Sequence, residues 1–258
     1  MINEIKLRRI AVDEGAPVGT IEKDLAITCA LKAISQTSLK QNLIFKGGTA
    51  IKKLYQPNAR FSEDLDFTAT QLEEKDALNS LTAINNTQID SISFETIQED
   101  AYTRQGKNYR LNYIGPLKYR NSIRIDLSFR ADIIETIEEK PVHSPYGSSL
   151  RSSIKTLNFT EIMAEKLRAM MTRESPRDYY DVWTHLNKIQ DKLHLRELVE
   201  KKCTLTEYEY NPASILDHDK IHRIDASWKI RLHHLVPRCP SFKEILPTLT
   251  KELHFLQT

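Results

Sequence analysis

The stretch FKGGTAIKKLYQPNARFSEDLDF, residues 45–67, decides how the first half of the chain is expected to fold. An apolar run ends at Phe45, a glycine pair follows, and AIKKLY after the glycines is helix-like. This order predicts a strand, a tight turn and a helix, because glycine adopts backbone conformations that other residues avoid. In RFSEDLDF apolar and polar residues alternate, so a strand there would place Asp64 and Asp66 on one face.

Two later segments alternate in the same way and are expected to be strands of the same sheet. They are NYRLNYI at 108–114 and NSIRIDLSF at 121–129, and Asp126 falls on the polar face of the second. A helix with Thr20 as its N-cap is expected to run to about Ser35. The mixed stretch at 71–100 is expected to contain a helix.

From about Thr160 to the end, the apolar residues follow helical spacing. Pro141, Pro145 and Gly147 precede this change and mark the crossover. We therefore predict an α/β (α+β) protein with a strand-rich domain at residues 1–150 and a helical domain at residues 151–258.

The composition sets limits on function. The chain has 258 residues, 40% hydrophobic and 28% charged, which is typical of a globular protein. A net charge of +2 excludes general affinity for polyanions, so nucleic-acid contacts would need local clusters of charge. The three cysteines form no CxxC pair, which indicates neither a zinc site nor a disulfide framework. With a charged N-terminus and no run of about 20 apolar residues, we expect no signal peptide, no membrane anchor and a cytoplasmic location.

The paired aspartates and the glycine pair together indicate a metal site beside a phosphate site. Two carboxylates one residue apart on a strand converge their oxygens, which suits Mg²⁺ held together with substrate phosphates. Asp126 on a neighbouring strand is the natural third ligand. Gly47 and Gly48 would let backbone N–H groups approach a phosphate, and Thr49 adds a hydroxyl. The alternative is that the aspartates lie on a solvated face and the glycines form only a turn.

The same residues carry a family resemblance. Residues 45–67 resemble the signature of the AbiEii/AbiGii-type nucleotidyltransferase toxins, a branch of the DNA polymerase β-like nucleotidyltransferase superfamily. The resemblance extends to IEKD upstream, to AEKLRAMMTRESPRDYYDVW downstream and, more loosely, to SWKIRLHHLVPRCPSFKEIL, so it covers the chain from about Thr20 to the end. That superfamily has a Gly-Gly or Gly-Ser turn, a Dx[DE] pair and a later carboxylate. Here the interval between glycines and aspartates is longer than usual, but RFSEDLDF is the form typical of this toxin branch.

The resemblance implies a nucleotidyltransferase-type mixed sheet with flanking helices, followed by a helical domain that closes over the nucleotide. It implies NMP transfer from an NTP to RNA, with tRNA the leading acceptor, aided by Mg²⁺ or Mn²⁺. It also implies a toxin that is paired with a cognate antitoxin in abortive infection and phage defence. The implied catalytic residues are Asp64, Asp66, Asp126, Lys166 and Asp178, of which the first three hold the metal. The implied nucleotide-binding residues are Lys46, Gly47, Gly48, Thr49, Ser62 and Lys166.

Lys166 stands out in the predicted helix TEIMAEKLRAMM, residues 160–171. At 100° per residue it points into the apolar arc, whereas Glu161, Glu165 and Arg168 share the opposite side. A buried ammonium without a partner costs several kcal/mol, so the side chain either extends out to solvent or faces an anion. The resemblance assigns this lysine to catalysis and to contact with the triphosphate.

The segment SPRDYYDVW predicts another helix, with Ser175 as N-cap and a proline at its first position. Asp178 at the third position would complement the helix dipole, and Asp181 is expected to turn further toward solvent. The resemblance makes this RDxxD element catalytic and favours Asp178, although the choice between the two aspartates stays open. Arg177 is placed to hold either acid or a phosphate.

Between residues 101 and 125 six basic residues and four tyrosines occur without an acid. They are Arg104, Lys107, Arg110, Lys118, Arg120 and Arg124, with Tyr102, Tyr109, Tyr113 and Tyr119. Such a segment either binds single-stranded RNA ends or forms an exposed hairpin whose tyrosines pack on the sheet. His218 and His222 have the spacing of helical metal ligands, but with no third ligand nearby they do not indicate zinc. Two rival functions stay open: transfer to a protein or small-molecule hydroxyl, and a catalytically silent RNA-binding module.

Overall fold

The computed structural model describes residues 1–103 and 106–257 and divides into two compact units. The first unit comprises Met1–Ala131 and Thr136–Leu157. The second comprises Asp132–Glu135 and Asn158–Thr258. The division therefore falls after the last strand, a few residues beyond the position 150 expected from the sequence, and a short segment before that strand belongs with the helices.

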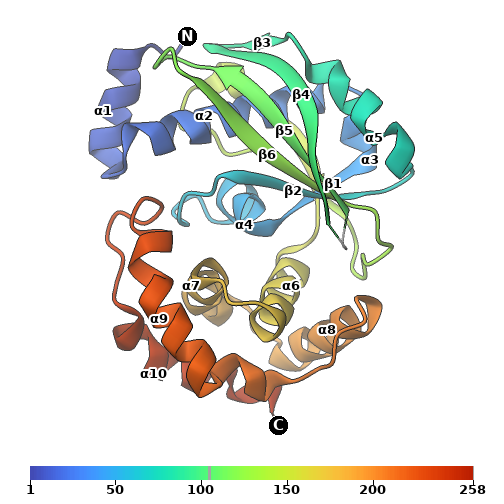
Figure 1. Cartoon of the computed structure of the whole chain (residues 1–258), viewed down its shortest axis with the longest axis vertical. Coiled ribbons are helices and arrows are strands. Elements are labelled where there is room, and N and C mark those ends of the chain that lie inside the picture. The colour runs from blue at the N-terminus through green and yellow to red at the C-terminus, as the bar shows by residue number, and fades with distance from the viewer. Residues whose placement is uncertain (104–105, 258) are drawn as a thin grey trace. The chain divides into compact units, whose positions relative to one another are not determined.

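The first unit is built on one mixed sheet, which has eight strands within the described residues (Figure 1). The strand order is β3-β4-β5-β6-β2-β1-β8-β7, and the pairs β2–β6 and β1–β8 are parallel while the other pairs are antiparallel. This sheet confirms the predicted fold class. The strands are β1 (Leu43–Lys46), β2 (Asp64–Ala69), β3 (Gln88–Ile89), β4 (Ile92–Thr103), β5 (Gly106–Ile114), β6 (Arg120–Ser128), β7 (Glu138–Pro141) and β8 (Ser153–Thr156).

Helix α2 is the central helix of the first unit, and its burial follows from its sequence. It is apolar on nearly every side and packs against several strands of the sheet, including β4, β6 and β8. It begins at Val18, directly after Pro17, so Thr20 is not its N-cap as predicted. The helices of this unit are α1 (Glu4–Glu14), α2 (Val18–Ser35), α3 (Leu39–Asn42), α4 (Gly47–Ala50), the π-helical turn η1 (Ile51–Tyr55) and α5 (Glu74–Leu81).

The IEKD segment and the AIKKLY segment are joined by a buried ion pair. Lys53 Nζ lies 2.6 Å from Asp24 Oδ2 and also donates to Thr28 Oγ1, and the Tyr146 hydroxyl donates to the same Asp24 oxygen. Both charged side chains are almost fully buried. Since removing one partner of a buried pair leaves an uncompensated charge, this pair fixes α2 against the turn that follows the glycines.

The second unit is helical, as the spacing after Thr160 predicts. None of the helices in the described part of the chain combines the length and the apolar character needed to cross a membrane. The helices of the second unit are α6 (Phe159–Thr172), α7 (Pro176–His185), α8 (Lys192–Leu205), α9 (His218–Leu232) and α10 (Phe242–Glu252).

Strand β4 is the element that the sequence did not reveal. Residues 71–100 contain the expected helix, α5, but also β3 and most of β4. The pairing of β4 with β5 shifts register between Phe94 and Ile97 and again between Glu99 and Ala101. These shifts break the alternation of apolar and polar residues by which a strand is recognised.

Candidate functional site

A row of polar residues crosses four neighbouring strands of the sheet. Asn108 on β5 is paired with Asp126 on β6, Asp126 with Asp66 on β2, and Asp66 with Lys46 on β1. Paired residues of adjacent strands project to the same face of a sheet. The alternation in β2 also puts Asp64 on this face, because Leu65 and Phe67 are buried on the other. The fold therefore brings Asp64, Asp66 and Asp126 to one face, as the sequence predicts.

Arg124 lies among these carboxylates. It is paired across the strands with Asp64, and its Nε lies 2.7 Å from Asp126 Oδ1. Partial burial acts to lower the pKa of Arg124, but Asp126, Asp64 and Asp66 outweigh it and raise the pKa. The Asn108 amide is oriented with its nitrogen toward Asp126 and its oxygen toward Arg124. In this orientation it donates to Asp126 Oδ1 at 2.9 Å and accepts from Arg124 Nη2 at 2.9 Å. Arg124 thus supplies positive charge to the acidic face.

The glycine pair lies directly against this face. Gly47 has a φ of +77°, and a Cβ there would lie 2.1 Å from Asp66 Oδ2, so a side chain is excluded both by conformation and by space. A Cβ on Gly48 would lie 2.9 Å from Arg60 Nη2 and 3.3 Å from Ser62 Oγ. The glycines therefore permit the backbone after β1 to approach Asp66, Arg60 and Ser62.

Thr49 has a structural partner. Its hydroxyl donates to the Asp64 carbonyl oxygen at 2.5 Å, and the residue is 1% exposed. This bond fixes the beginning of β2 relative to α4. Lys46 is paired with Asp66 of the acidic face, and the Ser62 hydroxyl lies beside Gly48.

The donor set on this face suits a hard divalent cation, because carboxylate oxygens are the ligands that Mg²⁺ and Mn²⁺ prefer. The space left by the absent Cβ of Gly47 adjoins one of these oxygens. In the described residues, however, no three His, Cys, Asp or Glu side chains are grouped closely enough to hold one metal ion together. Asp126 is engaged by Arg124, so a metal at this face would compete with the guanidinium.

Lys166 is part of a buried ion cluster in the second unit. Its Nζ lies 2.8 Å from Asp178 Oδ1 and 3.0 Å from Asp181 Oδ2. Arg173, which the sequence reasoning missed, donates from Nε to Asp178 Oδ2 at 2.7 Å. Burial acts to raise the pKa of Asp178, but Lys166 and Arg173 outweigh it and hold the pKa below its ordinary value.

This cluster corrects the prediction for Asp181 and shows which anions Lys166 faces within this unit. Asp181 does not turn toward solvent; it is 2% exposed, because Lys166 supplies a partner that a helical wheel of α7 cannot reveal. Lys166 does point inward as predicted, and the anions it faces within this unit are Asp178 and Asp181. Arg173 lies just after α6, outside the helical pattern, so a helical wheel does not include it. Its position five residues before Asp178 is the one sequence signal that indicates the contact between them.

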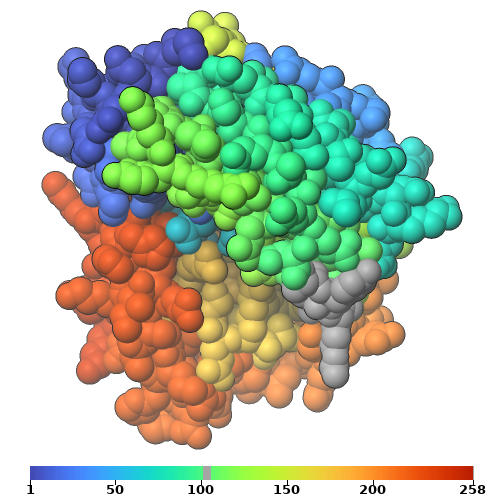
Figure 2. Space-filling view, turned by 45° about the horizontal axis from the view of Figure 1, so that its top comes forward, coloured from blue at the N-terminus to red at the C-terminus, as the bar shows by residue number. Residues whose placement is uncertain are grey.

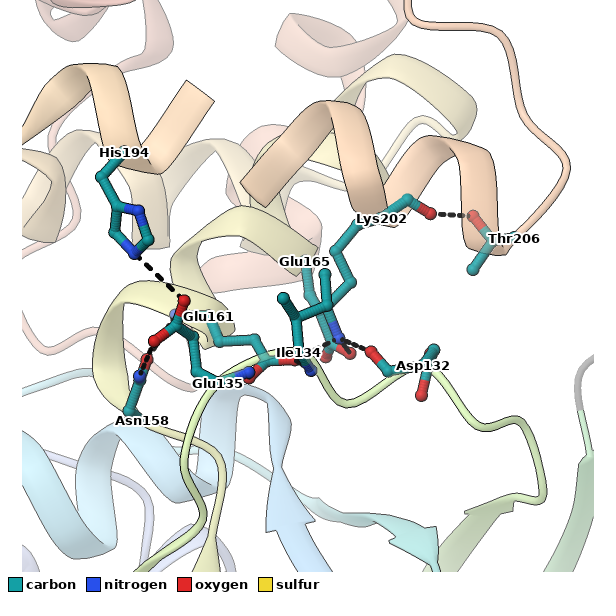
Figure 3. A network of polar contacts seen from close by, with 9 residues as sticks. All are labelled: Asp132, Ile134, Glu135, Asn158, Glu161, Glu165, His194, Lys202 and Thr206. Atoms are coloured by element: carbon teal, nitrogen blue, oxygen red, sulfur yellow. Dashed lines mark hydrogen bonds and ion pairs between the residues drawn. The ribbon is translucent and has the colours of Figure 1, made fainter. Parts of the chain in front are cut away.

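A second ion cluster joins α6 to α8 and to the segment Asp132–Glu135 (Figure 3). Lys202 Nζ lies 2.7 Å from Glu161 Oε1 and 3.1 Å from Glu165 Oε1, and it donates to the Asp132 carbonyl oxygen at 2.6 Å. Glu161 also accepts the backbone N–H groups of Ile134 and Glu135. Glu161 and Glu165 share one side of α6, as predicted, and this side is covered by α8, so that Glu161 is fully buried.

The basic stretch from 104 to 124 is largely neutralised by acids from β4 and α5. Arg110 is paired with Asp100, Arg120 with Glu95, and Lys107 with Glu99 and Glu74. Two of its four tyrosines are buried in the core, namely Tyr109 and Tyr113. Arg104 and the side chain of Tyr102 lie outside the described residues. These pairings favour the hairpin interpretation of this stretch over RNA binding.

His218 and His222 are stacked edge to face on α9, with ring centroids 5.0 Å apart. Asp219 lies 3.3 Å from the His218 ring, and both of these side chains are exposed.

A mixed sheet with two aspartates on one strand, one of them against Gly47, and a third aspartate on the parallel neighbour is characteristic of a nucleotidyltransferase-type fold. The chain belongs to the AbiEii family of nucleotidyl transferase toxins of type IV toxin–antitoxin systems, whose family model matches residues 29–247. It is thus a nucleotidyltransferase and the toxin of such a system.

Solved structures show the same fold at low sequence identity. MenT4, a nucleotidyltransferase toxin from Mycobacterium tuberculosis H37Rv, is 19% identical with a TM-score of 0.77, and the match covers 100% of this chain and 90% of that one. JHP933 from Helicobacter pylori is 17% identical with a TM-score of 0.58, and the match covers 94% of each chain. None of the curated proteins compared with the chain matches it.

Proposed function

We propose that this nucleotidyltransferase moves a nucleoside monophosphate from an NTP to an RNA acceptor, with tRNA as the leading candidate. The observation that carries the proposal is the polar row Asn108, Asp126, Asp66 and Lys46, with Gly47 against Asp66. The carboxylates of this row can hold a metal. On the same face of the sheet, the Lys46 cation and the backbone at Gly47 can meet phosphates.

In this proposal Asp64, Asp66 and Asp126 hold Mg²⁺ or Mn²⁺, which supplies charge neutralisation at the α-phosphate. Gly47, Gly48 and Ser62 contact the nucleotide, and Lys46 adds positive charge at the edge of the face. A metal held by Asp126 would compete with Arg124, whose guanidinium would then be available for an anionic substrate group. Lys166 and Asp178 stay predicted members of the catalytic set, with Arg173 holding Asp178 in place.

The test is transfer of label from an α-labelled NTP, one nucleotide at a time, to total RNA with Mg²⁺. We expect wild-type protein to label RNA and Asp66→Asn to lose the activity by roughly a hundredfold or more, because the amide lacks the negative charge of the carboxylate and binds a divalent cation more weakly. Asp76→Asn, at an exposed position of α5, removes the same charge away from the face and serves as the matched control.

Nuclease and protease digestion of the labelled product identify the acceptor. Label that resists nuclease and is lost with protease assigns the acceptor to protein, which is the rival function. Equal labelling by wild type and Asp66→Asn would contradict the assignment of the metal site. Growth of cells expressing the chain without its antitoxin adds a second readout, in which only the active protein is expected to slow growth.

A further inference from the structure

Arg124 and Asp126 form an accessible ion pair on the acidic face of the first unit. They lie two residues apart on β6 and project to the same face, because side chains alternate along a strand. The Arg124 side chain is 50% exposed and that of Asp126 is 30% exposed, so a ligand can reach both. Part of the β5–β6 hairpin that carries them lies at the surface drawn in green in Figure 2.

Asn108 bonds to both members of this pair. Its amide donates to Asp126 Oδ1 at 2.9 Å and accepts from Arg124 Nη2 at 2.9 Å, while Arg124 Nε lies 2.7 Å from the same Asp126 oxygen. Asn108 itself is 7% exposed, so its amide is held within the protein while the two charges stay accessible. The three side chains therefore form a closed set of hydrogen bonds that keeps the guanidinium on Asp126.

The Arg124 guanidinium keeps N–H donors for a ligand. Nε bonds to Asp126 and Nη2 bonds to Asn108. No further hydrogen bond of this side chain is formed within residues 1–103 and 106–257. A guanidinium has more N–H groups than these two, so Arg124 can also bind a phosphate through two oxygens, as arginine commonly does.

The charges of the acidic face explain why a cation is held there. Asp64, Asp66 and Asp126 share this face, and like charges at close range repel one another. Arg124 is bonded to Asp126 and paired across the strands with Asp64, so it supplies countercharge to two of the three carboxylates. A divalent cation held by the same carboxylates would supply the same countercharge. Arg124 and such a cation therefore compete for Asp126.

We propose that Arg124 is the countercharge of Asp126 until a nucleotide and its divalent cation bind, and that it then bonds to the triphosphate of that nucleotide instead. Asn108 is the positioning residue, because it holds both ends of the contact that is exchanged. A triphosphate fits better than an RNA phosphate, because Mg²⁺ is bound together with substrate phosphates and Arg124 lies beside carboxylates that would hold it. This inference rests on the proposed function in placing the metal at Asp64, Asp66 and Asp126.

The exchange predicts that the metal and the nucleotide strengthen each other's binding. Without nucleotide, Arg124 gives up its bond to Asp126 and gains no replacement. With nucleotide, it gains phosphate oxygens. Coupling of this kind is reciprocal and commonly amounts to about 5- to 150-fold in affinity. Wild-type protein is therefore expected to bind the metal alone only weakly.

Binding of Mn²⁺ alone is the first measurement, made through the electron paramagnetic resonance signal of free Mn²⁺ at about 0.15 M salt. Arg124→Gln should bind Mn²⁺ about fivefold or more tightly than wild type, because the competing guanidinium is gone. Arg110→Gln is the matched control, since Arg110 is the cross-strand neighbour of Arg124 but is bonded to Asp100. Its loss should change the affinity by less than about twofold, because salt screens a charge that does not touch the site. Equal affinities of the two variants would overturn the proposal.

Binding of a nucleotide that cannot react is the second measurement. The probes are the α,β-methylene analogues of ATP, GTP, CTP and UTP, titrated calorimetrically at saturating Mn²⁺. Arg124→Gln should bind the preferred analogue about fivefold or more weakly, whereas Arg110→Gln should bind it like wild type. Unchanged affinity for the analogue in Arg124→Gln contradicts the exchange. A loss seen only in the binding of a short RNA also contradicts it and assigns Arg124 to the acceptor.

A double-mutant cycle tests Asn108. Asn108→Leu removes both of its hydrogen bonds and should tighten the binding of Mn²⁺ alone by about threefold, because the guanidinium is then held less firmly. In the Arg124→Gln background the same substitution should give no such tightening, since Asn108 acts through Arg124. Equal tightening in both backgrounds would remove the positioning role. All affinities are compared at a temperature where each variant is folded.

Asp66→Asn separates this proposal from the proposed function. It should weaken the binding of Mn²⁺ by roughly tenfold or more, because it removes a carboxylate of the site and leaves Arg124 in place. Mn²⁺ binding that does not respond to Asp66→Asn refutes the metal site of the proposed function. Mn²⁺ binding that depends on Asp66 but not on Arg124 refutes the exchange alone.

Discussion

Helix α6 takes part in two buried ion clusters, and it supplies the cation to one of them and the anions to the other. In one, α6 supplies the cation, Lys166, to two aspartates of α7. In the other, α6 supplies two glutamates to Lys202 of α8. The side chain of Lys202 is 0% exposed and also donates to a backbone carbonyl oxygen, whereas that of Lys166 is 10% exposed and lies beside Arg173, which is largely exposed.

The difference teaches how a structural lysine is distinguished from a candidate functional one. Lys202 has three oxygen partners, two from α6 and one from the segment Asp132–Glu135, and its side chain is 0% exposed, so its whole bonding capacity serves the fold. Lys166 keeps some access to solvent, and one of its aspartates has a second cation. Helical spacing does not separate the two residues; their oxygen partners and the remaining exposure of the side chain do.

The largest effect is expected from Lys202→Met, which leaves two glutamates in the protein interior without their cation. The free energy of unfolding should fall by about 3–5 kcal/mol. Urea unfolding followed by circular dichroism measures it, and Lys201→Met, at the exposed neighbouring position, should stay within about 0.5 kcal/mol of wild type. A loss as small as that of the control would show that the buried ion pairs of Lys202 contribute no net stability.

Lys166→Met should cost less stability, about 2–3 kcal/mol, because Arg173 still compensates Asp178. Transfer activity and NTP affinity should nevertheless fall far more than in Lys202→Met, once both variants are compared at a temperature where each is folded. If the two variants lose activity only in proportion to their loss of stability, the distinction between the lysines fails.

The two clusters should also differ in their response to pH. The pKa of Asp178 is lowered on folding, so its contribution is present above the ordinary value of 3.8 and is lost as the pH falls through the lowered value. The pKa of Lys202 is raised, because Glu165 and Glu161 outweigh burial, so its contribution is present below 10.5 and is lost as the pH rises through the raised value.

The stability difference between wild type and Asp178→Asn should therefore shrink only below about pH 4. The difference for Lys202→Met should shrink only above about pH 10.5. Unfolding midpoints measured across the pH range test both directions, and a reversed order would refute the two ion-pair assignments.

The smallest effect is expected within the Lys202 cluster. Glu161 is fully buried and accepts two backbone N–H groups, whereas the Glu165 side chain is 13% exposed. Glu165→Gln should thus cost about 1 kcal/mol and Glu161→Gln clearly more. Equal losses in urea unfolding would show that the backbone bonds to Glu161 add nothing.

Local periodicity predicted which side chains share a polar face within each strand. The alternation in RFSEDLDF and NSIRIDLSF places Asp64, Asp66 and Asp126 on polar faces, and the parallel pairing of β2 with β6 brings Asp66 opposite Asp126. The pairing itself joins segments about sixty residues apart, which no local pattern reveals. Asp126 was assigned to the neighbouring strand because it is the one acid on the polar face of its segment, and the family resemblance implied the same residue.

The residues that were misjudged are charged groups whose partners come from another element. Asp181 was expected to turn toward solvent because a helical wheel records only the side on which a charge lies, while burial depends on whether a countercharge meets it there, as Lys166 does for Asp181 and Lys202 does for Glu161. The basic stretch from 104 to 124 contains no acid of its own, so the sequence did not indicate its acidic partners. Its acids, Glu95, Glu99 and Asp100, lie on β4, whose bulges had hidden the strand.

The segment Asp132–Glu135 has a consequence for how this gene can be divided or recombined. The chain leaves its first unit after Ala131, returns at Thr136 and leaves again after Leu157, so neither unit is encoded by one uninterrupted stretch. A fragment starting at Asn158 would keep Glu161 and Lys202 but lack the backbone groups of residues 132–135 that bond to them. The helical half therefore depends on residues 132–135 and is not separable from the rest of the chain at a single position.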